Sequence, residues 1–170
     1  MAILEMRRAS FARGRTNIVA PISLQLEEGG TLHWRCELAQ AGRVLARMAA
    51  GIVKCTAGSV FIGDYDPKIQ PVQVKRLVGF IPHPPPSNPF DSPQAYFAYR
   101  SDLWNLQCAS AVERGMRIFL ALHAQPPNLA LAVSGALLHE PKLLVAENLE
   151  AELFDELANL RGAAALFATR

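Results

Sequence analysis

The chain has 170 residues, of which 51% are hydrophobic and 19% are charged, so it is long enough for one domain with a buried core. Its net charge of +2 at neutral pH argues against nucleic-acid binding, which normally needs a concentrated basic face. The N-terminal arginines Arg7, Arg8, Arg13 and Arg15 are interpreted as a solvated edge. No apolar run reaches the ~20 residues of a membrane-spanning helix, and we expect a cytoplasmic protein. Its three cysteines are odd in number and scattered, which indicates neither a disulfide framework nor a metal site.

The first half of the chain is expected to contain mostly short strands joined by turns. Apolar and polar residues alternate at period two, as in strands, over residues 3–6 and 22–27, with a turn signal at 11–14 between them. Further strands are predicted at 31–36, 59–62 and 75–81. Helical spacing of apolar residues predicts a helix over 38–50, which Gly51 would end.

The second half is expected to be mainly helical at first and then to alternate helices with strands. A proline-rich connector at 83–89 excludes helix, and two aromatic-rich helices are predicted after it. The predicted elements are helices at 92–106, 109–122, 129–138 and 150–160, and strands at 142–146 and 163–168. Apolar strands alternating with helices predict an α/β fold with a partly parallel sheet. We expect a single domain over 1–170, with an α/β core (1–83 and 129–170) and a helical insertion (84–128).

The order of these elements and several local strings resemble the ATPase subunits of ABC transporters. The strings, in chain order, are Arg47–Gly51 followed by Thr56–Ile62, Arg76–His83, Ala136–Ala146 and Leu166–Arg170. They are similar to the end of the first core helix and the turn after it, the run into the Q-loop, the run into the Walker B strand, and the strand before the switch histidine. The resemblance covers nearly the whole chain. It implies a P-loop NTPase-like sheet flanked by helices, with an antiparallel N-terminal part and a helical insertion.

The stretch that should bind phosphate is degenerate. A phosphate loop needs glycines for its amide cradle, a Lys for charge and a Ser or Thr hydroxyl for magnesium, whereas residues 36–43 read Cys-Glu-Leu-Ala-Gln-Ala-Gly-Arg. Without a gap, Gly42 stands at the lysine position and Arg43 at the hydroxyl position. With a gap of one residue, Arg43 and Val44 stand there instead. In both cases the magnesium ligand is missing, and we interpret Arg43 as a surface residue.

The residues expected at the catalytic carboxylates are also altered. After the strand at 142–146, where the family has Asp and then Glu, this chain has Glu147 and Asn148. Glu147 could still hold a metal through water, but Asn148 cannot accept a proton, and losing a general base costs about 10²–10⁴-fold in rate. His83 replaces the Q-loop Gln and Arg170 the switch His.

Other parts of the nucleotide site are weakened as well. The signature loop is reduced to residues 122–127, in which two prolines remove amide donors. Phe11 stands where the family stacks an aromatic ring on adenine, and we interpret it as covering the sheet edge. Isolated histidines such as His139 are interpreted as structural.

These losses predict a catalytically inactive ABC-ATPase-like subunit that acts by binding. The resemblance implies a partner that is an ABC membrane subunit, another ABC ATPase, or both, and a position peripheral to the inner (plasma) membrane. The helical insertion carries candidate interface aromatics, namely Tyr96, Phe97, Tyr99 and Trp104. No cofactor, metal or nucleic acid is expected. Two alternatives stay open: a diverged but active ATPase that uses ATP and magnesium, and a soluble regulatory protein without a membrane partner.

Overall fold

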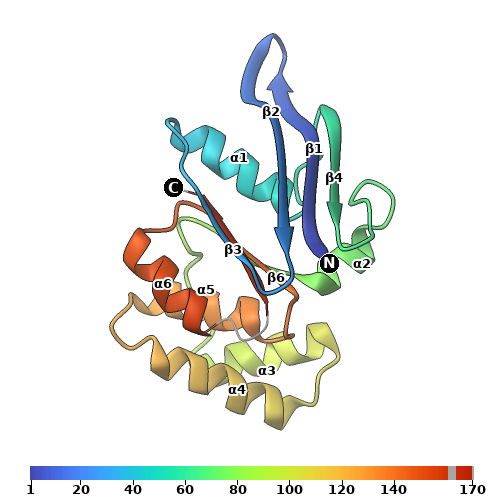
Figure 1. The fold of residues 1–170 in the computed structure, drawn as a ribbon. Coiled ribbons are helices and arrows are strands. Elements are labelled where there is room, and N and C mark those ends of the chain that lie inside the picture. The colour runs from blue at the N-terminus through green and yellow to red at the C-terminus, as the bar shows by residue number, and fades with distance from the viewer. Residues whose placement is uncertain (161–163, 170) are drawn as a thin grey trace.

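The computed structural model describes residues 1–160 and 164–169. Its elements are drawn in Figure 1. They are β1 (Ala2–Arg13), β2 (Thr16–Glu27), β3 (Thr31–Trp34), α1 (Ala39–Ala49), β4 (Ala57–Ile62), α2 (Pro71–Leu77), β5 (Val78–Ile81), α3 (Pro93–Trp104), α4 (Cys108–Ala121), α5 (Pro127–Leu137), β6 (Leu143–Ala146), α6 (Ala151–Leu160) and β7 (Ala165–Thr169).

The strands form two sheets of different kinds. The first is antiparallel, with the order β2-β1-β4, and the second is parallel, with the order β3-β7-β6-β5. Every connection in the parallel sheet must cross over, and helices supply those crossovers. This architecture confirms the predicted α/β fold with an N-terminal antiparallel part and a parallel sheet flanked by helices.

The two central parallel strands are buried on both faces. In β6, Leu143 and Val145 face the core that includes α1 and the antiparallel sheet, whereas Leu144 and Ala146 face the core formed with α5 and α6. Strand β7 alternates in the same way. Strands covered on both faces have continuous apolar sequences, which is why these segments are uniformly hydrophobic.

Helix α1 links the two sheets. It contacts β1, β2 and β4 of the antiparallel sheet and β6 and β7 of the parallel sheet. Its buried residues include Leu45, Ala46, Met48 and Ala49. The opposite face of α1, which carries Arg43 and Arg47, is exposed. From this exposed face Arg47 reaches Glu147 at the end of β6.

Helices α3 and α4 lie at the end of the molecule away from the antiparallel sheet (Figure 1). They pack against each other and against α5 through a separate small core that contains Phe97, Ala111, Leu131 and Leu138. Phe97 is completely buried and lies so close to Gly115 of α4 that an added Cβ there would come within 2.6 Å of its ring. The close contact of α3 with α4 therefore depends on this glycine.

Two predicted elements differ from the structure. The stretch 75–81 is not one strand, because α2 occupies Pro71–Leu77 and β5 begins only at Val78. Helix α2 has just seven residues and buries only Val74, so it carries no helical periodicity that a sequence pattern could reveal. The turn expected at 11–14 is also narrower. Strand β1 continues to Arg13 and pairs there with Thr16, which leaves only Gly14 and Arg15 in the turn.

Candidate functional site

Glu147 follows directly after β6, at the carboxyl end of the parallel sheet. Polar side chains at this edge of a parallel sheet usually form ligand sites in α/β proteins. Here the side chain is fully buried, and the backbone N–H of Glu147 donates to the carbonyl of Ile81 at the end of β5. A buried carboxylate needs partners to compensate for its lost hydration, and two elements supply them.

The first partner of Glu147 is Arg47 on α1. Its Nε donates to Oε1 of Glu147 at 2.5 Å, and the Arg47 side chain stays 44% exposed while that of Glu147 is 0% exposed. The hydrogen bond and the charge of Glu147 raise the pKa of the Arg47 guanidinium. A charged donor of this kind makes one of the stronger hydrogen bonds that proteins use.

The second partner is the backbone of His83, just after β5. Its N–H donates to Oε2 of Glu147 at 2.9 Å, and the His83–Pro84 peptide bond is cis. His83 therefore lies beside Glu147 and contributes its amide to the carboxylate. Both carboxylate oxygens of Glu147 are thus engaged within the protein.

Asn148 has a left-handed backbone, with φ of 45°. Its N–H donates to the hydroxyl of Thr169 on β7 at 3.4 Å, and the next N–H, of Leu149, donates to the Thr169 carbonyl at 2.7 Å. The chain after β6 is thereby tied to the end of β7. The switch-position residue Arg170 lies outside the described residues.

The connection from β3 to α1 spans residues 35–38. Helix α1 begins at Ala39 and has neither a side-chain cap nor an acidic residue in its first turn. Gly42 is buried, and an added Cβ would lie 3.5 Å from Cβ of Cys36 and 3.6 Å from Cβ of Thr169. These are ordinary van der Waals distances. Close approach of a neighbouring segment therefore does not require a glycine at position 42.

Phe11 and Arg43, which the sequence assigned to one degenerate nucleotide site, line the same small cavity of about 230 Å³. Arg13 and Arg47 line it too. Phe11 also packs against the main core beneath the antiparallel sheet. The cavity is therefore bounded by an aromatic ring and three guanidinium groups, and Arg47 connects it to Glu147.

These residues do not fit a magnesium-bound triphosphate. Magnesium prefers carboxylate oxygens, a hydroxyl and water in octahedral geometry, but both oxygens of Glu147 already accept hydrogen bonds from Arg47 and His83. Neither Gly42 nor Arg43 offers a hydroxyl. In the described part of the chain, no group of three or more His, Cys, Asp or Glu side chains is placed to hold a metal ion.

A groove of about 360 Å³ opens elsewhere, between β5 and the helices α3 and α5. Its aromatic wall is formed by Tyr96 and Trp104 of α3 and Phe80 of β5. The Trp104 ring stacks on His139 with centroids 4.0 Å apart, and the Tyr96 ring lies beneath the Arg100 guanidinium. We refer to this concavity as the aromatic groove.

The four candidate interface aromatics occupy different environments. Tyr96 and Trp104 line the aromatic groove and are half-buried. Tyr99 is 48% exposed and contacts Phe90. Phe97, in contrast, is fully buried between α3 and α4. Three of these side chains can therefore meet a partner, and Phe97 acts in the core.

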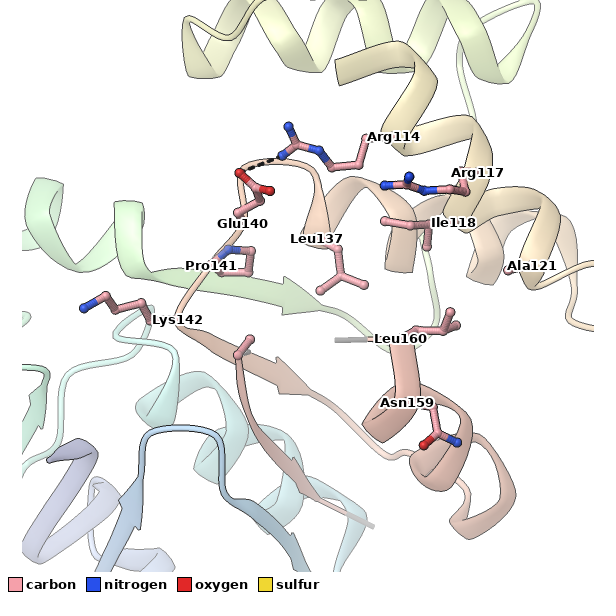
Figure 2. Close-up of a pocket in the computed structure, with 11 residues that line it drawn as sticks. Arg114, Arg117, Ile118, Ala121, Leu137, Glu140, Pro141, Lys142, Asn159 and Leu160 are labelled. Atoms are coloured by element: carbon pink, nitrogen blue, oxygen red, sulfur yellow. Dashed lines mark ion pairs between the residues drawn. The ribbon is translucent and has the colours of Figure 1, made fainter. Parts of the chain in front are cut away.

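A larger cleft than the aromatic groove lies on another face. Figure 2 shows this cleft of about 550 Å³ between α4, the turn before β6 and α6. It is lined by three basic side chains, two of which have carboxylate partners: Arg114 pairs with Glu140 at 3.1 Å, and Lys142 pairs with Glu28 at 3.6 Å. Most of its positive charge is therefore compensated within the chain.

No protein-family model and no curated protein matches this sequence. Solved structures match it closely in fold. An ATP-binding subunit of an ABC transporter superposes with a TM-score of 0.75 and 18% identity, covering 99% of this chain and 79% of that one. A putative ABC transporter ATP-binding protein from Pyrococcus furiosus gives 0.75 and 12%, covering 98% and 90%. The protein cbiO1 from Clostridium perfringens, part of the ABC transporter complex cbiONQ, gives 0.69 and 14%, covering 99% and 78%.

The fold is that of an ABC transporter ATP-binding subunit. At identities this low the similarity concerns the ABC ATPase fold alone, and the chemistry must be argued from the residues. The helices described for this chain are too short or too polar to serve as a bilayer-spanning segment.

Sequence reasoning missed three residues that the structure brings forward. Arg47 was used only as part of a family-like string, and the 100 residues between it and Glu147 hid their contact. Arg100 lies on α3 and His139 in the turn after α5, and the two meet only in the fold. For Arg100 the sequence did contain a signal. It lies four residues from both Tyr96 and Trp104 on α3, and residues four apart share one face of a helix.

Proposed function

We propose that this chain is a catalytically inactive ABC-ATPase-like subunit that acts by binding a membrane subunit of an ABC transporter, an intact ABC ATPase, or both. The observation that carries the proposal is the state of Glu147. The carboxylate that would hold the magnesium shell is buried, and both its oxygens accept hydrogen bonds from Arg47 and His83. A metal at this carboxylate would have to share it with the charged guanidinium of Arg47, which repels a cation.

The residues expected to bind phosphate also support the proposal that the chain is catalytically inactive. Anion binding at a helix start depends on free amide groups and on cationic side chains aimed at the ligand. The residues before α1 supply Glu37 and no Lys. Arg43 lines the cavity beside Phe11, but it brings no hydroxyl for magnesium.

The proposed binding surface is the aromatic groove. Ile52 lines the groove and is 56% exposed, and Leu103, on the same helix as Tyr96 and Trp104, is 59% exposed. Leu103 follows Arg100 by three residues and Tyr99 by four, so all three share one face of the helix. Aromatic anchors beside exposed apolar residues are typical of protein interfaces.

The partner that we propose for this surface is inferred from the proteins that share this fold. Two of the matching structures are described as subunits of ABC transporters or their complexes, which by definition contain membrane subunits. We expect the chain to keep the scaffold because the scaffold presents the groove, while selection for ATP hydrolysis is gone. An oligomer with an intact ABC ATPase would use the face around α1.

The proposal is tested by co-purification with a matched pair of variants. The tagged chain is expressed in its native host, membranes are solubilised gently, and co-eluting multi-span proteins are identified. We expect Leu103→Ala to lower recovery of the membrane subunit several-fold. Leu120→Ala on α4, which is similarly exposed at 61%, should leave recovery unchanged. Recovery of the chain only from the soluble fraction, without a membrane protein, would overturn the transporter role.

A further inference from the structure

Two arginines of α4 line the cleft of Figure 2 and point toward the turn that carries Glu140. Arg114 and Arg117 are three residues apart, so they share one face of the helix. Arg114 has partners within the protein, because its Nη1 donates to the carbonyl of Leu138 at 2.9 Å and pairs with Glu140 at 3.1 Å. In the described part of the chain, no ion pair joins Arg117 to a carboxylate.

Lys142, the third cation of the cleft, adds little charge to its interior. The Lys142 amino group points away from the other lining side chains (Figure 2) and pairs with Glu28 at 3.6 Å. Glu140 is the only acidic residue among the described lining residues, and Arg114 is its partner. Among the residues that the structure describes, the uncompensated charge of the cleft is therefore the single positive charge of Arg117.

The remaining wall of the cleft is largely apolar. Ile118 on α4, Leu137 at the end of α5 and Leu160 at the end of α6 line it, together with Pro141. Leu137 is buried in the core that α5 and α6 form with the parallel sheet, and Ile118 and Leu160 pack against that core. Pockets for small molecules have volumes of about 300–1,000 Å³ and combine such apolar walls with a few polar groups. The cleft, at about 550 Å³, meets both conditions.

The charges and the apolar wall together define the ligand chemistry. One free guanidinium compensates one negative charge, whereas a phosphate dianion would carry a second charge close to the carboxylate of Glu140. A carboxylate also matches the planar fork of a guanidinium, which can donate two parallel hydrogen bonds to it. A small hydrated anion would leave the apolar wall in contact with water. The ligand must therefore carry a hydrocarbon part as well as its charge.

We propose that the cleft between α4 and α6 binds a small carboxylic acid with a hydrocarbon body, such as a medium-chain fatty acid. The ligand carboxylate pairs with Arg117, and the hydrocarbon part covers Ile118, Leu137 and Leu160. The ligand bridges the helical insertion, through α4, and the α/β core, through α6 and the turn before β6. Binding at this site requires neither a nucleotide nor a membrane partner, so it goes beyond the proposed function.

The test uses octanoate as the probe, and isothermal titration of the intact chain measures its affinity. Three further probes have the same hydrocarbon chain: 1-octanol is uncharged, octylammonium has the opposite charge, and octyl phosphate carries two negative charges at mildly alkaline pH. All are used below the concentrations at which they form micelles. We expect octanoate to bind with a dissociation constant below about 1 mM. Each of the other probes should bind at least about fivefold more weakly.

Two pairs of variants locate the site. Arg117→Gln should lower the affinity for octanoate at least about fivefold, whereas Lys75→Gln, which removes the same charge from the aromatic groove, should change it less than about twofold. Ala121→Phe fills the cleft from the last turn of α4 and should weaken binding by a similar factor. Ala109→Phe, in the first turn of the same helix and not among the lining residues, is its control. All four positions are exposed, and circular dichroism checks that the variants fold.

A charge reversal provides an independent measurement. Arg117→Glu should no longer bind octanoate and should bind octylammonium instead. Several results would overturn the proposal: no saturable heat with octanoate in the millimolar range, equal binding of 1-octanol, or tighter binding of octyl phosphate. Loss of octanoate affinity in Lys75→Gln but not in Arg117→Gln would also overturn it, because the ligand would then occupy the aromatic groove.

Discussion

Arg47 on α1 and Glu147 after β6 form an ion pair in which the acidic partner is fully buried and the basic partner is 44% exposed. The pair joins α1 to the end of β6. The backbone of His83 completes the coordination of the carboxylate. The acidic residue at the end of β6 is thus bound by a side chain of α1 and by a backbone amide.

Replacing Arg47 should destabilise the protein. Removing one partner of a buried pair costs about 3–5 kcal/mol, because it leaves an uncompensated charge. Since Arg47 is partly exposed, we expect Arg47→Met to lower the free energy of unfolding by about 1–3 kcal/mol, measured by urea denaturation.

Arg43→Met is the matched control for that variant. Arg43 is one helical turn earlier on the exposed face of α1, lines the same cavity, and does not contact Glu147. Its replacement should change the free energy of unfolding by less than about 0.5 kcal/mol. Equal effects of the two substitutions would show that the Arg47–Glu147 pair contributes nothing specific.

His139 should make stability fall with acidification. Its folded-state pKa is lowered from 6.5 to about 4, chiefly by burial, so the unfolded chain binds a proton that the folded chain refuses between those values. The free energy of unfolding should therefore decrease as pH drops from about 6.5 to about 4, by about 1–2 kcal/mol after allowance for partial exposure.

The His139→Phe variant keeps a ring to stack on Trp104 but cannot titrate. Its free energy of unfolding should fall less than that of wild type over the same pH range. The exposed His123 provides the control, and His123→Gln should retain the wild-type slope. An unchanged slope in His139→Phe would mean that other groups cause the acid dependence.

The neighbouring aromatics of α3 should separate into core and surface residues. Phe97 is completely buried and Tyr99 is 48% exposed. We expect Phe97→Ala to lower the free energy of unfolding by about 3–5 kcal/mol and Tyr99→Ala by less than about 1 kcal/mol, both measured by thermal and urea denaturation. A similar loss for both would contradict the placement of Tyr99 on the surface.

Restoring the missing phosphate-loop residues should not restore catalysis. An added Cβ at Gly42 meets only ordinary contacts, but Gly42 is buried, so the folding of Gly42→Lys/Arg43→Ser is first checked by circular dichroism. The folded variant should show no ATP hydrolysis above background, because Glu147 stays paired with Arg47 and Asn148 cannot act as a base. Turnover by this variant would show that the phosphate loop alone limits activity.

Some of this could be predicted from the sequence and some could not. The strand before Glu147 was recognisable because a strand buried on both faces is a continuous apolar run, and helix α1 because its apolar spacing is regular. Helix α2 was not, since it buries one residue only. The family-like order of strands assigned His83 and Glu147 to one predicted site, whereas the hydrogen bond from the His83 amide depends on backbone geometry.

The side-chain contacts could not be predicted from the sequence, for a different reason. The Arg47–Glu147 pair spans 100 residues, and the aromatic groove gathers Lys75, Arg100 and His139 from three segments. Such contacts depend on how the layers pack, and a local pattern contains no information about them. Phe97 and Tyr99 show the same limit, because both are aromatic residues of one helix and only the packing of α4 distinguishes them.

Isothermal titration of the purified chain with Mg-ATP tests the central claim most directly, namely that a carboxylate already paired with Arg47 and His83 cannot support nucleotide binding. The account predicts no saturable heat, which corresponds to a dissociation constant weaker than about 1 mM. Micromolar binding that is lost in Arg43→Ala or Glu147→Ala would contradict it and would make the chain a diverged but working ATPase.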